Sequence, residues 1–529
     1  MPSRLWSVVR RHWFLAAVLA LALAYAWPMQ GAGNAQNSQY ALVRALADGT
    51  PRIDRTRYET GDIVSADVTF YRGHVYSNKA PGLAFVSLPA FEAVRAAGLL
   101  PDGDPSRMLW VLGLFAVVVP AVILAALVRG VTERLVPGFG VLAAVVAGLG
   151  TLILPFATIY YNHVLAALLS FAAFAILLAE RQGPSRRWLV FAGGVLGGLA
   201  VTVEYANALI VAVLAVYALA RGSYIRRLLA YGAGLLVGLI PLLAYDQWAF
   251  GSILRVSYLV GSEGTANAEQ THLDPSLLVL LRNLVSSTGL VTLAPVLACA
   301  VAGAVLLFRR APAEACVVSA VVALMVLYAS SFGPSFGGYS PGPRYVVPAL
   351  PFAAVPIAAA FRRFPVTTAV LALASVVMMA AITATHVLAA YDGRWFHRLA
   401  DRQVVSTPAS FIGVTGAFTV LVFFAACAAA VIFAAKSTSP IRLRARDALC
   451  ASIAVAGWLL LATAAPSATE AARYGRFAVP GLAVLLLGSA LVAAATATGE
   501  VSRSEHSKGR GQPTSSTSNT SSPISPSSR

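Results

Sequence analysis

Acidic and basic side chains alternate in one polar stretch, residues 29–106, of an otherwise apolar chain. A carboxylate can take a proton from a hydroxyl group, and a cation can offset negative charge on a leaving phosphate. A loop longer than about 15 residues is commonly functional or disordered, and the interleaved tyrosines argue against disorder. A solvated, charged loop is the alternative. The charged and titratable residues in the middle of the stretch are Asp48, Asp54, Glu59, Asp62 and Asp67 together with Arg52, Arg55, Arg57, His74 and Lys79.

Further polar residues interrupt apolar sequence at separate places along the chain. His163 follows Asn162, Glu204 precedes Tyr205, and Arg344 follows a loop rich in glycine and proline. A forked guanidinium suits a phosphate group. The alternatives are a packed or capping histidine and ordinary carboxylates near the membrane surface. Together with an acid in the first loop, these residues suit a lipid phosphate substrate and a polar acceptor. The candidate substrate contacts are Lys79, His74, His163, Glu204, Tyr205 and Arg344.

The elements that must position these residues are membrane helices. The chain is 58% hydrophobic and 12% charged, whereas a soluble domain has about 25% charged residues. Its apolar runs are continuous and long enough to cross a bilayer as helices. We predict an all-α integral membrane protein of about fourteen transmembrane helices. The expected spans are 13–27, 107–129, 138–157, 162–180, 188–204, 206–220, 228–248, 284–307, 314–331, 345–361, 366–388, 409–434, 446–464 and 474–497.

Arginine-rich loops alternate with loops that have few basic residues, and the positive-inside rule sets the topology from them. It places both termini in the cytoplasm and the candidate residues on the outer face of the plasma membrane. We expect a signal-anchor region at 1–28, an extracytoplasmic loop at 29–106, a transmembrane domain at 107–498 and a disordered tail at 499–529. Within the loop we expect a helix over 38–47, capped by Asn37 or Ser38, and an interfacial helix over 83–97.

Several classes of protein are disfavoured. The net charge of +17 is explained by basic loops beside helix ends and by attraction to membrane lipids, so we expect no nucleic-acid partner. The sequence contains no P-loop or GxGxxG motif, which disfavours an ATP-driven pump. The four cysteines show no metal-binding or disulfide spacing. We assign no metal site and no definite cofactor; a divalent cation and the oligomeric state stay open.

Several motifs resemble polytopic bacterial glycosyltransferases of the GT-C fold, whose relatives include aminoarabinose transferases and protein O-mannosyltransferases. The motifs are ALVRALADGTPRID at 41–54, TGD at 60–62, GHVYSNKAPG at 73–82, PFATIYYNHVLAA at 155–167, GLAVTVEYANAL at 198–209 and GGYSPGPRYVVPALP at 337–351. The resemblance covers roughly 12–365. It implies a GT-C-like fold, a polyprenyl-phosphate sugar donor, a cell-envelope acceptor and a catalytic aspartate in the first outer loop.

The chain departs from the family at that aspartate. Relatives such as the aminoarabinose transferases have an acid in a DE-x-x-Y pattern before the first loop helix, whereas this chain has Gln36-Asn37-Ser38-Gln39-Tyr40. The expected base is therefore Asp62 in the TGD motif, with Asp54 as the second choice. Two other classes stay open. A secondary transporter or lipid flippase would also have many helices with polar residues in them, and a non-catalytic membrane scaffold would not need the missing acid.

Overall fold

The computed structural model describes residues 2–54, 67–100, 105–260, 275–332, 340–439 and 445–464. Asp62, the expected span at 474–497 and the tail at 499–529 lie outside these ranges.

The protein is a polytopic helical membrane protein. Within the described residues, eight helical stretches are long and apolar enough to cross a membrane, or nine if a bent pair counts as one span. Lipid accepts such helices because they satisfy their own backbone hydrogen bonds. The eight are α5–η1–α6 (Pro105–Gly113, Leu114–Val118 and Val119–Leu135), α9 (His163–Gln182), α12 (Tyr224–Phe250), α17 (Pro312–Ala329), η4–α18 (Arg344–Ala349 and Leu350–Arg363), α19 (Pro365–Ala384), η7–α21 (Ala417–Val420 and Leu421–Ser437) and α22 (Ala445–Ala464).

The expected count of fourteen helices is not confirmed. The expected span 284–307 is broken, since α14 (Leu277–Val285) and α15 (Leu290–Leu293) meet α16 (Val296–Phe308) at an 88° bend. Pro295, just before α16, cannot continue a helix from α15. The span 138–157 is likewise divided, into α7 (Gly140–Leu149) and α8 (Ile153–Ala157). Three further apolar helices are shorter than a typical crossing: α1 (Pro2–Ala26) in its apolar part, α10 (Arg187–Val203) and η2–α11 (Tyr205–Asn207 and Ala208–Leu219).

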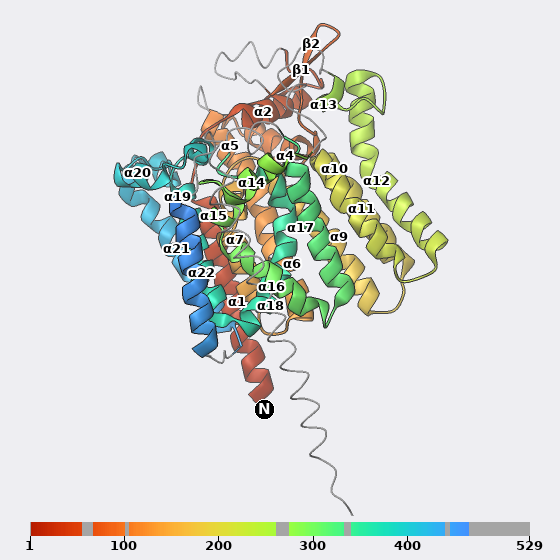
Figure 1. Ribbon diagram of the computed structural model, residues 1–529. Helices are drawn as coiled ribbons and strands as arrows, with labels where there is room; N and C mark the ends of the chain where they lie inside the picture. The colour runs from red at the N-terminus through yellow and green to blue at the C-terminus, as the bar shows by residue number, and fades with distance from the viewer. Residues whose placement is uncertain are drawn as a thin grey trace, which may run out of the picture.

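The first loop and α13 (Ser257–Val260) lie at one end of the bundle (Figure 1). The first loop there contains α2 (Asn34–Ala47), a hairpin of β1 (Val68–Tyr71) and β2 (His74–Ser77), and α4 (Gly82–Ala96). The short elements α13, η5 (Val387–Asp392), α20 (Trp395–Ala400) and η6 (Pro408–Ile412) complete the connections. The start of α1 lies at the opposite end of the bundle (Figure 1).

The first loop confirms one expected helix and corrects another. The structure has a helix, α4, where one was expected at 83–97. The helix expected at 38–47 begins earlier, at Asn34, and neither Asn37 nor Ser38 caps it. Ser38 is fully buried; its hydroxyl donates to the Asp67 carbonyl oxygen at 2.7 Å and lies 2.7 Å from Ser77 Oγ. Ser38 therefore fastens the hairpin to α2 instead of ending the helix.

The hairpin was not predicted, although its sequence is suited to one. Val68 pairs with Ser77 and Tyr71 with His74 in an antiparallel register. The two turn residues, Arg72 and Gly73, both have positive φ angles, 48° and 80°. Two consecutive positive φ angles match the right-handed twist of paired strands and make a tight two-residue turn.

Helix α18 is the most enclosed part of the bundle. Every residue from Leu350 to Phe361 is buried. At the edge, α10 and α12 lie side by side (Figure 1), and Gly194, Gly198, Gly234 and Gly238 leave no room for a Cβ between their backbones. Small residues of this kind let membrane helices approach closely. The outer face of α12 presents large apolar side chains suited to lipid: Leu228, Leu229, Leu236, Val237 and Ile240.

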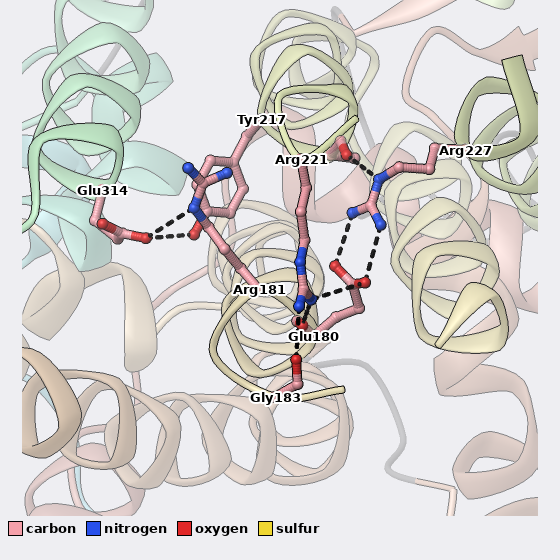
Figure 2. Close-up of polar contacts among 8 residues, drawn as sticks. Glu180, Arg181, Gly183, Tyr217, Arg221, Arg227 and Glu314 are labelled. Carbon is pink, nitrogen blue, oxygen red and sulfur yellow. Dashed lines mark hydrogen bonds and ion pairs between the residues drawn. The ribbon is translucent and has the colours of Figure 1, made fainter. Parts of the chain in front are cut away.

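A cluster of charged residues joins α9 and α11, near their C-terminal ends, to α12 and α17, near their N-terminal ends (Figure 2). Glu180 of α9 accepts two hydrogen bonds from Arg227 of α12, at 2.9 and 2.7 Å, and one from Arg221 at 3.1 Å. The next residue, Arg181, lies 3.5 Å from Glu314 of α17, which also accepts the Tyr217 hydroxyl of α11 at 2.8 Å. A forked guanidinium facing both oxygens of one carboxylate fixes orientation as well as distance, so the cluster sets how α9 stands against its neighbours.

Candidate active site

A polar cavity lies where the first loop meets the helices. It has about 520 Å³ of empty space, part of it open to solvent, and aromatic rings form much of its wall. Five predicted residues line it, namely Lys79, His163, Glu204, Tyr205 and Arg344. They come from segments far apart in the sequence, and a concave site with a few convergent polar groups is the usual form of a small-molecule site. The remaining lining residues are Asn78, Ala80, Tyr161, Asn162, Ala206, Tyr258, Tyr328, Phe332 and Tyr345.

The guanidinium of Arg344 is held by aromatic rings, not by an acid. Its Cζ lies 5.5 Å from the ring centre of Tyr161 and 5.2 Å from that of Tyr345. Its Nη2 donates a long hydrogen bond of 3.4 Å to the Tyr345 hydroxyl. Its Nε is buried and has no hydrogen-bond partner within the described ranges. No described carboxylate forms an ion pair with it. Its unused donors can therefore grip an incoming anion, and a guanidinium matches a phosphate in shape.

His163 and Glu204 form a buried pair next to Tyr161. His163 Nδ1 lies 2.8 Å from Glu204 Oε2, and the side chains are 1% and 11% exposed. The Asn162 amide donates to the same oxygen at 2.7 Å and to the Val203 carbonyl at 3.1 Å. The imidazole stacks on the Tyr161 ring, with centres 4.6 Å apart. The start of α9 and the break between α10 and η2 are thereby held together.

Lys79 brings a carboxylate to the edge of the cavity that the sequence had not singled out. Its Nζ lies 3.1 Å from Asp67 Oδ1. Burial alone would raise the pKa of Asp67, but the charges of Lys79 and Arg344 outweigh it and hold that pKa below its ordinary value. Asp67 is therefore an anion at neutral pH. Because Lys79 is paired with Asp67, Arg344 is the cation of this cavity that has unused donors among the described residues.

A close approach of two backbones sets where Lys79 lies. At Gly82, the first residue of α4, an added Cβ would lie 2.7 Å from the Thr202 carbonyl oxygen and 2.8 Å from Val203 Cα. Glycine alone avoids these contacts. The Lys79-Ala-Pro-Gly82 turn can therefore rest on the end of α10, next to Glu204. The KAPG sequence thus places Lys79 in the wall of the same cavity as the histidine–glutamate pair.

Two predicted residues lie elsewhere. Asp54 and His74 contact each other, with Oδ2 and Nδ1 2.7 Å apart, and the Val75 amide donates to Asp54. Both are about one-third exposed, and neither lines the cavity. Asp54 therefore stabilises the hairpin through His74 and the Val75 amide. Asp62, the expected base, lies outside the described residues. Within those residues, no three His, Cys, Asp or Glu side chains gather as a metal site would require.

A second, smaller cavity lies beside the first. Gln36 of α2 lines it together with Tyr25, Gln30, Trp110 and Tyr160. Gln36 belongs to the stretch where relatives of the resembled family have their acid, so that stretch faces a neutral chamber here. The consecutive residues Tyr160 and Tyr161 line different cavities. The Tyr160 hydroxyl donates to Ser87 of α4 at 2.7 Å, which ties the segment between α8 and α9 to the first loop.

No family model matches the chain, and no curated protein matches it in sequence. Solved structures of similar shape include ArnT from Cupriavidus metallidurans bound to undecaprenyl phosphate, at 16% identity and a TM-score of 0.47, covering 91% of this chain and 77% of that one. The archaeal oligosaccharyltransferase AglB from Archaeoglobus fulgidus has 13% identity and a TM-score of 0.42, covering 89% and 60%. These proteins are of the class that the sequence motifs resemble, GT-C-like membrane glycosyltransferases.

Proposed function

We propose that the protein transfers a sugar from a polyprenyl-phosphate donor to a cell-envelope acceptor at the outer face of the plasma membrane, with both termini in the cytoplasm. The observation that carries the proposal is Arg344, whose guanidinium lines the cavity with unused donors and no carboxylate partner among the described residues. A lipid phosphate supplies the anion that this arrangement lacks. As the sugar–phosphate bond breaks, negative charge grows on the phosphate oxygens, and a cation fixed there stabilises it.

The other lining residues suit the sugar and the acceptor. Aromatic rings such as Tyr328 and Tyr345 provide flat apolar surfaces, while their hydroxyl groups are polar handles. Tyr205 and Lys79 complete the wall, and the Tyr205 hydroxyl lies 3.0 Å from Ser257 Oγ of α13. His74 and Asp54 stabilise the hairpin outside the cavity, and Asp62 is the base proposed from the sequence.

The test uses the purified full-length protein in liposomes with a panel of radiolabelled polyprenyl-phosphate sugars and a crude cell-envelope acceptor. Wild-type protein is run beside Asp62→Asn and Arg344→Lys. Transfer from one donor that Arg344→Lys lowers strongly would support the proposal. Transfer that Asp62→Asn also abolishes would assign the base to Asp62. Absence of both transfer and donor binding across the panel would contradict the proposal and favour a transporter, flippase or scaffold.

A further inference from the structure

The buried pair of His163 and Glu204 has the arrangement of an oriented base. Glu204 Oε2 lies 2.8 Å from one ring nitrogen of His163, Nδ1. The other nitrogen, Nε2, is buried and has no hydrogen-bond partner among the residues that the structure describes. In a neutral ring whose Nδ1–H faces a carboxylate, Nε2 holds the lone pair and can accept a proton. Nδ1 and Oε2 are close enough for a hydrogen bond but do not form an aligned one, and catalytic hydrogen bonds commonly align only in the complex with substrate.

The surroundings fix the ring in place. Tyr161 stacks on the imidazole with planes 15° apart, and Phe156 and Tyr345 meet it edge-on. Asn162 holds the glutamate through its amide at 2.7 Å. A catalytic group must be held in position by its neighbours to act efficiently. A histidine buried only as packing would not need a carboxylate beside it inside a polar cavity.

The charged residues around the pair have different partners. Arg344 and Lys79 are the cations acting on His163, and Glu204 is its nearest acid. Asp67 is already paired with Lys79 and has a lowered pKa. A carboxylate with a low pKa is a weak base, because base strength falls with the pKa of the conjugate acid. His163 Nε2 lines this cavity with no hydrogen-bond partner among the described residues, so the geometry favours it over the paired Asp67 as the proton acceptor.

We propose that the His163–Glu204 pair, in place of Asp62, is the base of the transfer reaction, a role that rests on the proposed function. The acceptor oxygen forms a bond to the anomeric carbon while the bond from that carbon to the phosphate oxygen breaks. The lipid phosphate leaves with the electron pair, beside Arg344. The acceptor's hydroxyl proton passes to His163 Nε2, and Glu204 stabilises the resulting imidazolium. The proton is then released to solvent.

The test measures kcat, KM for the donor and their pH dependence in liposomes, using whichever donor of the panel the wild-type protein turns over. A well-placed base contributes about 10²–10⁴-fold to a rate. His163→Gln should lower kcat by about that factor, with donor KM changed less than about threefold, and it should remove the acidic limb of the kcat profile. Added imidazole should restore part of the rate. Glu204→Gln should keep the limb but move it to lower pH, because the imidazolium loses its stabilising anion.

His386→Gln is the matched control, since His386 is an exposed histidine outside the cavity, and it should keep wild-type kcat and pH profile. The melting temperature of each variant shows that it is folded. A folded His163→Gln variant that keeps wild-type kcat, or keeps the acidic limb, would overturn the base assignment while wild-type turnover leaves the proposed function standing. A raised KM with unchanged kcat would also overturn it, because that result assigns His163 to binding alone. A wild-type protein that transfers no sugar would overturn both.

Discussion

Glu180 and His163 stand at opposite ends of one helix, α9. They are seventeen residues apart by number, which corresponds to about 26 Å along a helix. At the Glu180 end, Arg221 and Arg227 fasten α9 to α12 and to the turn before it (Figure 2). The His163 end opens into the candidate active site. The ion cluster thus fixes the rotation and height of the helix that presents the proposed base.

Removing one member of that cluster should weaken the whole bundle. Arg227→Met leaves the fully buried Glu180 with fewer partners, and breaking a buried ion pair costs about 3–5 kcal/mol. We expect a clear fall in the melting temperature of the protein in detergent. The matched control is Arg226→Met, since Arg226 is the exposed neighbour in the same turn. Equal melting temperatures for the two variants would show that the cluster does not stabilise the fold.

The glycine of the KAPG turn should tolerate no side chain. Gly82→Ala forces apart two backbones whose atoms would lie 2.7–2.8 Å from the new Cβ, and overpacking of this kind costs about 1–3 kcal/mol. Both the melting temperature and sugar transfer should fall, because Lys79 moves with the turn. Gly130→Ala is the control, since its Cβ would meet nothing within 4 Å. If Gly82→Ala matched Gly130→Ala in both measurements, the close approach would not matter.

Arg344→Lys keeps the positive charge but loses the forked donors. Loss of one donor that stabilises transition-state charge lowers kcat by about 10²–10³-fold. We expect a fall near the lower end of that range in the transfer assay. Arg310→Lys makes the same exchange at an exposed site outside the cavity and should have no effect. Wild-type transfer by Arg344→Lys would mean that charge alone is sufficient.

The Asp67–Lys79 pair predicts a pH-dependent stability. The pKa of Asp67 is lowered in the folded protein, so its contribution is present above its unfolded pKa of about 3.9 and is lost as the pH falls through the folded value. Asp67→Asn should therefore melt below wild type at pH 7, and the gap should narrow below about pH 4. Asp401→Asn, at an exposed aspartate, is the control. A gap that stays constant with pH would refute the pairing.

Much of the architecture could be predicted because lipid imposes a simple rule on the sequence. Spans such as 162–180 and 366–388 correspond closely to α9 and α19, since a long apolar run has few alternatives to a transmembrane helix. The breaks in 138–157 and 284–307 could not be predicted from hydropathy, which does not distinguish a straight helix from a bent one. Pro295 was the available signal for the second break.

The site was predicted in part, for a physical reason. His163, Glu204, Tyr205 and Arg344 are conspicuous because a polar group in apolar sequence is costly, and they do line one cavity with Lys79. Asp67 was missed because the first loop has many acids, and only the β1–β2 hairpin distinguishes it from the others. The alternation in VTFYRGHVYS around Arg72-Gly73 would have revealed that hairpin.

Tyr160 and Tyr161 lie in the segment between α8 and α9. We expect this segment to tolerate a change in its length less well than a change in one of its side chains. Each tyrosine ring lines a different cavity, and Asn162 and His163 are the next two residues in the sequence. Deleting a single residue here would advance every later side chain by one place. Tyr161 would take the position of Tyr160, and the imidazole of His163 would leave its place beside Glu204. A point substitution alters the wall of one cavity, whereas a change of one residue in length would alter the walls of both.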